Sequence, residues 1–381
     1  MTEQEKMIAY IDSIEEEMIE FWKEIVLLES NSYCKEGVDA VGRTLAEFCK
    51  NKLGYHTRFE EDPIHGNCLA ACSCPFEDFE HGIVLSAHMD TVHKKGYFDP
   101  VIAQDDTYLY GPGAGDCKGG IVMALTTALA LKSIDYDRRP IKLLFAADEE
   151  IGSPVGRRFY PVELKGCDYM FNAESGFRNK LVTGRKASLI AIYNITGEGA
   201  HIGYLTDKPK SAVREAALKL LALEDASDYE NLVFCGGVIG GGNVATSVPS
   251  QCRLEVNVRI KDGSYVDEAV RILKDAAEKT FVPGTSCTLE IKGKLFPMSA
   301  CEENEKLCRA FSAASESLGF GAFTGSFVGG ASDAAYASAQ GIPVICATGP
   351  VVDFQHTRNE RVMTATMAQR AKIHVKTILS L

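Results

Sequence analysis

Short apolar runs alternate with helical segments between about residues 83 and 172. The runs are bounded by turn residues and are too short for core helices, so they read as buried strands. A helix is predicted over the segment GGIVMALTTALALKS that follows Asp116. This alternation is typical of βαβ units with a largely parallel sheet. The predicted strands are GIVLSA (82–87), IKLLFAA (141–147) and CDYMFNA (167–173).

The stretch 186–294 has a different pattern. Its apolar residues alternate with polar ones, as in half-exposed antiparallel strands, in ASLIAIYNIT, CRLEVNVRI and CTLEIKG. Two helical stretches, KSAVREAALKLLALED and YVDEAVRILKDAAEKTF, separate these strands. From NEKLCRAFSAASESLG onward the helix–strand alternation returns, with IPVICAT as a buried strand. We therefore predict an α/β protein: a discontinuous, mostly parallel-sheet domain (1–185 and 295–381) that carries a smaller inserted α+β domain (186–294).

Length and charge narrow the class of protein. A chain of 381 residues suggests two domains. The net charge of −12 argues against a nucleic-acid partner or an anionic membrane surface. We find no apolar run near the ~20 residues of a membrane helix. The N-terminus lacks the features of a signal peptide and predicts an amphipathic helix, so we expect a cytoplasmic protein. The predicted buried side of that helix holds Ile11, Ile14, Met18, Phe21, Trp22 and Ile25.

The 13 cysteines are scattered and form no CxxC pair, which fits mostly buried thiols in a reducing compartment. Cys68, Cys72 and Cys74 invite a zinc-site interpretation. However, they lie in a short apolar run with small residues between HGN and a proline. A buried strand is the favoured interpretation of this segment.

Polar residues follow several predicted strands directly, where open α/β sheets collect their active sites. Each of these polar motifs, taken alone, is also common at exposed or structural positions. The glycine-rich turn GPGAG resembles a phosphate loop only weakly, because it lacks the P-loop lysine spacing. Several carboxylates at one sheet edge, however, would repel each other unless cations neutralise them. Two histidines and three carboxylates suit Zn²⁺ and exceed one tetrahedral site, so the set favours two metals sharing a carboxylate. The polar residues at these places are His88, Asp90, Asp116, Asp148, Glu149, Glu150, Glu174 and His356.

Two residues near His88 have other expected roles. Asp90 would accept the second ring N–H of His88 and fix its tautomer. His93, three residues further on, is expected to face solvent at the mouth of the site rather than bind metal.

The motifs HMDTV, YGPGAGDCKGG, LFAADEEIGS, FNAESG, GEGAHIG, GGASDAAYA and FQHTRNE occur in this order over residues 82–360. Together they resemble the dinuclear-zinc peptidase and deacylase family, which contains carboxypeptidase G, aminoacylase, acetylornithine deacetylase and succinyl-diaminopimelate desuccinylase. The segments GGNVATSVPS, VNVR and SDAAYASAQGIPVI are most similar to the carboxypeptidase G (glutamate carboxypeptidase) type.

The resemblance implies a zinc-peptidase catalytic domain with a ferredoxin-like lid or dimerisation domain, and two Zn²⁺ per subunit for which Co²⁺ or Mn²⁺ can substitute. His88 and Glu174 would hold one zinc, Glu150 and His356 the other, and Asp116 would bridge them. Glu149 would be the general acid/base. The family commonly has a cis peptide bond after the bridging aspartate and a second aspartate next. Here that residue is Cys117, and we still expect the cis bond.

The resemblance also assigns substrate-binding roles in a homodimer formed through 186–294. His201 would stabilise the oxyanion in the partner subunit's site, and Arg259 would bind a substrate carboxylate. Thr246 stands where the family has asparagine, and Lys294 where carboxypeptidase G has arginine. Lys180 would contact an acidic substrate side chain. The expected function is a zinc carboxypeptidase that releases a C-terminal, glutamate-like amino acid from a small peptide.

Three other functions remain open from the sequence. An N-acyl-amino-acid deacylase of the same family would run the same chemistry on an N-acyl amino acid. A catalytically silent binding homologue is disfavoured because all six metal and acid/base positions are intact. A cysteine hydrolase that uses Cys117 is weaker still.

Overall fold

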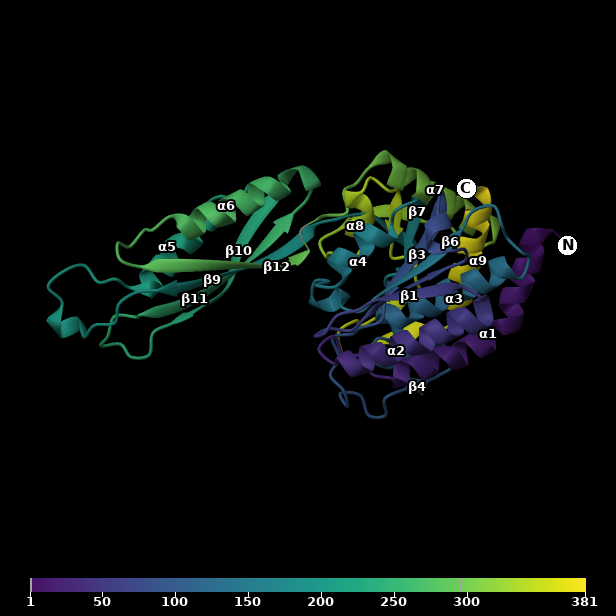
Figure 1. The fold of residues 1–381 in the computed structure, drawn as a ribbon, viewed down its shortest axis with the longest axis horizontal. Helices are drawn as coiled ribbons and strands as arrows, with labels where there is room; N and C mark the ends of the chain where they lie inside the picture. Colours follow the sequence, from purple (N-terminus) through teal and green to yellow (C-terminus); the bar gives the residue numbers. More distant parts are fainter. Residues whose placement is uncertain (1, 295) are drawn as a thin grey trace. The chain divides into compact units, whose positions relative to one another are not determined.

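The computed structural model describes residues 2–294 and 296–381 (Figure 1). The chain forms two compact units. The first contains the chain up to Gly184, Ala300–Phe327 and Ser332–Leu381, and the second contains Arg185–Ser299 and Val328–Ala331. The catalytic and lid or dimerisation roles expected for the two parts stay predictions.

An eight-stranded sheet forms the centre of the first unit, in the order β1-β2-β6-β3-β7-β14-β8-β13. Its central strands β6, β3, β7 and β14 run parallel, whereas β1, β2 and β8 pair antiparallel with their neighbours. The predicted parallel sheet is therefore confirmed at the centre. The strands are β1 (His56–Glu60), β2 (Cys68–Cys72), β3 (Gly82–His88), β6 (Ile141–Ala146), β7 (Cys167–Asn172), β8 (Lys180–Arg185), β13 (Thr324–Val328) and β14 (Val344–Cys346).

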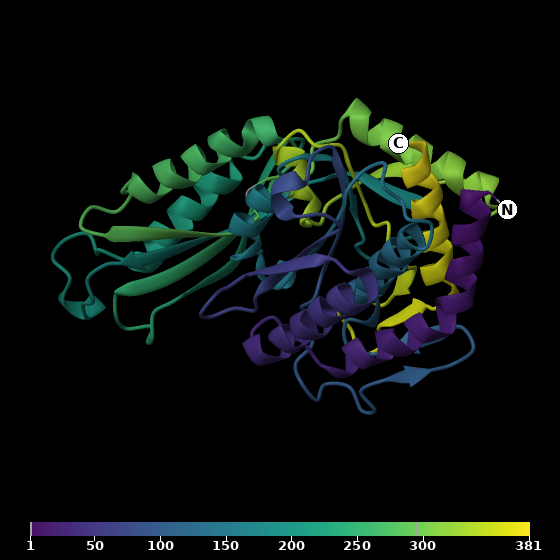
Figure 2. The same cartoon turned by 45° about the vertical axis from the view of Figure 1, so that its right-hand side comes forward.

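Strands β3 and β6 are buried along their whole length, which explains why they read as continuous apolar runs. The helices of this unit pack around the sheet, and α1 and α9, the first and last helices, lie side by side (Figure 2). These helices are α1 (Glu3–Leu27), α2 (Lys35–Phe48), α3 (Gly119–Lys132), α4 (Gly156–Glu163), α7 (Glu302–Ser317), α8 (Ala334–Ala339) and α9 (Ala365–Ser380).

The predicted N-terminal amphipathic helix is confirmed as α1. Its buried side also contains Met7 and Val26, whereas Ile14 and Phe21 are only half-buried. A capping box at Thr2 and Glu5 satisfies the free N–H groups of its first turn.

Helix α3 packs against α1, α9 and the sheet and is apolar all round. Among the described residues, Ala114–Lys132 is long and apolar enough to cross a membrane by length and composition, and its most apolar window is entirely buried in the protein. The expectation that no segment approaches this length was wrong. Burial on every side accounts for the apolar composition.

A small sheet in the first unit, in the order β15-β16-β5-β4, was not predicted. Its strands are only two or three residues long, too short for a periodic signal. The connection from β15 to β16 carries His356. The strands are β4 (Ala103–Gln104), β5 (Tyr108–Tyr110), β15 (Val352–Asp353) and β16 (Arg361–Met363).

The second unit is a four-stranded antiparallel sheet in the order β10-β11-β9-β12, against which α5 (Ala212–Glu224) and α6 (Val266–Glu278) pack. The chain order βαββαβ with this strand order is the ferredoxin-like arrangement that we expected. Predicted strands are confirmed as β9 (Ala187–Thr196), β11 (Gln251–Ile260) and β12 (Ser286–Lys294). The edge strand β10 (Leu232–Gly241) was missed because its glycines and exposed second half hide the alternation.

Candidate metal centre

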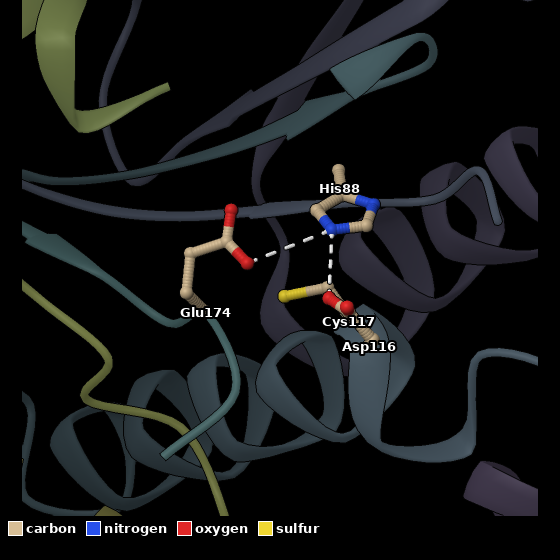
Figure 3. Close-up of side chains that lie close together, drawn as sticks. All are labelled: His88, Asp116, Cys117 and Glu174. Atoms are coloured by element: carbon tan, nitrogen blue, oxygen red, sulfur yellow. Dashed lines mark hydrogen bonds and ion pairs between the residues drawn. The ribbon is translucent and has the colours of Figure 1, made fainter. Parts of the chain in front are cut away.

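The candidate ligands lie where neighbouring parallel strands end. His88 is the last residue of β3, Glu150 follows β6, and Glu174 follows β7. Since β6, β3 and β7 are adjacent and parallel, their carboxyl ends meet at one edge of the sheet. Asp116 reaches the same place from the irregular turn Ala114–Lys118 that precedes α3, and Figure 3 shows it below the ring of His88.

The first cluster contains His88, Asp116, Cys117 and Glu174, whose ligand atoms all lie within 4.8 Å of one another. The Nε2 atom of His88 is 3.2 Å from Oδ1 of Asp116 and 3.7 Å from Oε2 of Glu174 (Figure 3). All four residues are buried. The sequence analysis named His88, Asp116 and Glu174 as ligands but did not name the Cys117 thiol as one.

The second cluster contains Asp116, Glu150 and His356. The Nε2 atom of His356 lies 3.3 Å from Oδ2 of Asp116 and 3.3 Å from Oε2 of Glu150. The two oxygens of the Asp116 carboxylate therefore face different histidines. His356 has a φ of 62°, a left-handed conformation that non-glycine residues rarely adopt and that tends to occur at functional sites.

The electrostatics of the second cluster favour a cation. Burial raises the pKa of the Glu150 carboxyl to about 8, and the charges of Asp116 and Glu149 add to the effect. Hydrogen bonds to Asp116 and Glu150 raise the pKa of His356 to about 11. Oε1 of Glu150 is buried without a hydrogen-bond partner among the described residues. This buried oxygen without a partner and the mixed imidazole and carboxylate donors fit divalent metal ions.

Asp90 connects the first ligand to the acidic turn. It is fully buried, and Nδ1 of His88 lies 3.0 Å from its backbone carbonyl oxygen and 3.2 Å from its Oδ1. Its carboxylate also accepts the backbone N–H groups of Glu149 (3.0 Å) and Glu150 (3.2 Å). Burial opposes its ionisation, but hydrogen bonds from His88 and Ser32 outweigh this and lower the pKa of Asp90. One buried residue, Asp90, thus orients a histidine through its carbonyl and carboxylate oxygens and fixes the backbone that carries two glutamates.

Glu149, the expected acid/base, directly precedes Glu150 in the helical turn Glu149–Ile151 and is half-buried. Because the two residues are consecutive, Glu149 lies at the same end of the sheet as the metal-type cluster.

The turn that carries Asp116 is held by residues distant in the sequence. Oε1 of Glu360 accepts the backbone N–H groups of Gly115 and Asp116, each at 3.1 Å. Nε1 of Trp22 donates to the carbonyl oxygen of Ala114 at 2.9 Å. The peptide bond between Asp116 and Cys117 is cis, as expected. Glu360 was not predicted as a site residue, and its only sequence signal is its place four residues after His356.

His93 was expected to face solvent, and this prediction was wrong. The side chain is buried, and its Nε2 lies 2.7 Å from Oε2 of Glu360. The ring also stacks on Tyr97 at a centroid distance of 5.7 Å. The partner carboxylate is distant in the sequence, so local pattern could not reveal the contact. His93 belongs to neither metal-type cluster of the described residues.

The predicted substrate-binding residues are divided between the two units. Lys180 begins β8 in the first unit and is exposed. In the second unit, half-buried Arg259 on β11 donates through Nη1 to the carbonyl oxygen of Gly329 at 3.1 Å. The side chain of Lys294 lies outside the described part of the structure.

His201 and Thr246 lie together in the second unit. Both are exposed, and the backbone N–H of Ile202 donates to the carbonyl oxygen of Thr246 at 3.0 Å. An isolated antiparallel bridge joins His201 to Ser247. Nδ1 of His201 accepts the N–H of Gly203, so the proton of the neutral ring is on Nε2. The resemblance placed both residues in the substrate site, and the fold makes them neighbours.

The prediction that Cys68 and Cys72 lie in a buried strand is confirmed. Cys68 and Cys72 are in the fully buried strand β2. The phosphate-loop interpretation of GPGAG finds no support, because the nearby Lys118 has a fully buried side chain and is not available to a phosphate.

Comparison with known proteins settles the family. The sequence profile of peptidase family M20/M25/M40 matches residues 84–380. The chain belongs to this family. The predicted membership of the peptidase and deacylase group is thereby confirmed, and this M20 protein is a hydrolase of the metallopeptidase class.

Its relatives include both peptidases and deacylases. Carboxypeptidase G2 of Pseudomonas sp. (strain RS-16) is 28% identical over 380 residues, covering 96% of this chain and 89% of the relative. Succinyl-diaminopimelate desuccinylase of Wolinella succinogenes is 29% identical and covers 80% and 84%. The crystal structure of aminopeptidase PepT from Bacillus cereus superposes with a TM-score of 0.75 at 20% identity, covering 96% and 98%, and supports the fold alone.

Proposed function

We propose that this M20 protein is a di-zinc carboxypeptidase that releases a C-terminal, glutamate-like amino acid from a small peptide. The observation that carries the proposal is the position of Asp116. Its Oδ1 is 3.2 Å from His88 and its Oδ2 is 3.3 Å from His356, so one carboxylate serves two clusters. This is the arrangement expected of a bridging ligand.

In this proposal His88 and Glu174 would hold one ion, Glu150 and His356 would hold the other, and Asp116 would contribute to both sites. When bound, such ions act as Lewis acids that lower the pKa of water and polarise a carbonyl oxygen. Zinc suits the donor set, and Co²⁺ or Mn²⁺ can take its place.

The chain itself moves the protons. The Glu149 carboxylate takes a proton from the attacking water as the new C–O bond forms. It then gives that proton to the leaving amide nitrogen as the C–N bond breaks. Asp90 keeps Glu149 in place through the Glu149 N–H and, by accepting from Nδ1 of His88, leaves Nε2 of that ring for the metal.

In this proposal the substrate-binding residues come from both units, and His201 acts within a homodimer. Arg259 offers a planar fork that suits a terminal carboxylate. His201, with its proton on Nε2, is able to donate to the developing oxyanion of the partner subunit's substrate, with Thr246 beside it. Lys180 and Lys294 are the candidates for an acidic substrate side chain.

A second candidate is an N-acyl-amino-acid deacylase. The similarity to a succinyl-diaminopimelate desuccinylase favours it, since that relative covers 80% of the chain at slightly higher identity than carboxypeptidase G2. Both candidates use the same metal centre and the same Glu149.

The test is a side-by-side assay of the zinc-loaded protein on glutamyl dipeptides, folyl-glutamates and N-acetyl or N-succinyl amino acids. Release of C-terminal glutamate with the highest kcat/KM supports the carboxypeptidase. Preference for the acyl amino acids establishes the deacylase instead. Chelation should abolish either activity, and turnover that survives complete metal removal would refute both. A metal-replete protein inactive on every substrate would point to a silent homologue.

A further inference from the structure

Cys117 is the one residue of the first cluster without a role in the proposed mechanism. Its side chain is fully buried, and its Sγ is within 4.8 Å of the ligand atoms of His88, Asp116 and Glu174. Figure 3 shows the sulfur on the side of Asp116 that faces the Glu174 carboxylate. The thiol therefore borders the space where the first ion would be held.

The surroundings leave the sulfur available for a metal. The S–H group donates a hydrogen bond to the carbonyl oxygen of Ala173 at 3.0 Å. The position is fixed by the backbone, because a Cβ at Gly120 would lie 1.9 Å from that same carbonyl oxygen. Only glycine allows α3 to approach Ala173 so closely, and this approach brings Cys117 beside Glu174.

Sulfur changes the chemistry of the donor set. Carboxylate and imidazole are hard-to-borderline ligands, whereas a thiolate is soft and selects zinc-like ions over Mn²⁺. A coordinating thiol gives up its proton to the solvent when the ion binds. With Cys117 included, the first site offers nitrogen, oxygen and sulfur donors, and the second site, without a cysteine among its described residues, offers only nitrogen and oxygen.

We infer that Cys117 is a further ligand of the ion held by His88 and Glu174, and that it makes this site more selective for soft divalent metals than the site of Glu150 and His356. The inference rests on the proposed metal centre. The alternative is that the thiol only fills space against Ala173.

Cobalt substitution tests the inference directly, with readouts that do not require catalysis. The wild-type protein, Cys117→Ser and Cys117→Ala are loaded with Co²⁺, and their absorption spectra are recorded. A Co²⁺–sulfur bond gives a charge-transfer band in the near ultraviolet, whereas nitrogen and oxygen ligands give only the visible ligand-field bands. Cys68→Ser is the matched control, because Cys68 is equally buried but lies in β2, outside the cluster.

We expect the band in wild type and in Cys68→Ser and its loss in both Cys117 variants. The ratio of Cd²⁺ to Mn²⁺ affinity should fall on the order of 10–100-fold in Cys117→Ser. Ligand-field bands without the sulfur band in wild type would overturn the inference and leave the metal centre intact. No Co²⁺ binding by folded wild type would overturn the proposed metal centre itself. Circular dichroism of each variant identifies any failure to fold, and Cys117→Asp, which restores the family's common residue, is a third variant without sulfur.

Discussion

Truncation of Glu360 tests how the turn that carries Asp116 is held. In Glu360→Ala the buried acceptor of three donors is lost. These donors are the N–H groups of Gly115 and Asp116, each at 3.1 Å, and Nε2 of His93 at 2.7 Å. Glu360 is fully buried, so water cannot replace the lost oxygens without entering the core.

The expected loss in the free energy of unfolding follows from the contacts of Glu360. A buried donor left without an acceptor costs roughly 1–3 kcal/mol, and three such donors lose their acceptor here. We expect Glu360→Ala to lower the free energy of unfolding by about 4 kcal/mol. Glu360→Gln should lose only about 1–2 kcal/mol, because its amide oxygen still accepts from Gly115 and Asp116.

Urea unfolding measures the free energy, and hydrogen exchange at the amides of Gly115 and Asp116 measures the local effect. Glu16→Gln, an exposed change on α1, is the control and should be neutral. Metal affinity should fall on the order of 10–100-fold in Glu360→Ala. If Glu360→Ala unfolds at the wild-type urea concentration with unchanged protection of both amides, the reasoning is refuted.

Three further predictions concern other parts of the first unit. Glu149→Gln should lower kcat by about 10²–10⁴-fold at unchanged metal content; loss of metal would instead make Glu149 a ligand. Burial lowers the pKa of His374 from 6.5 to about 3. Between pH 6.5 and pH 3 only the unfolded chain therefore binds a proton at this residue. The free energy of unfolding consequently falls as the pH drops below 6.5. From pH 8 to pH 5, wild type should therefore lose about 2 kcal/mol more than His374→Phe in urea titrations, whereas exposed His56→Gln should follow wild type. Ser32→Ala removes a 2.7 Å hydrogen bond to the buried Asp90 carboxylate and should cost about 1.5–3 kcal/mol in the same titrations; a neutral result would mean that water or a neighbour replaces the hydroxyl.

The local pattern of apolar and polar residues was sufficient to predict most of the fold. β3 and β6 are buried on both faces, so their apolar runs stand out, and β9 and β11 alternate because the helices cover one face of their sheet. The candidate ligands were also accessible from the sequence, because each follows a strand or a glycine turn and parallel strands end at one edge.

What the sequence could not reveal depends on contacts between distant segments. Glu360 is more than 200 residues from Gly115, Asp116 and His93, and its residue type alone is typical of an exposed loop. The same holds for Ser32, which reaches Asp90 from the loop before α2. Such supporting contacts produce no periodicity, so pattern analysis finds the ligands but not the residues that orient them.

The central claim is that one carboxylate, Asp116, is shared by two divalent ions. A crystal structure of the zinc-loaded protein with anomalous data at the zinc edge tests it most directly. We predict two peaks about 3.5–4 Å apart, one beside His88 and Glu174, the other beside Glu150 and His356, with Asp116 between them. A single peak at full occupancy, or two peaks that Asp116 does not contact, would contradict the claim.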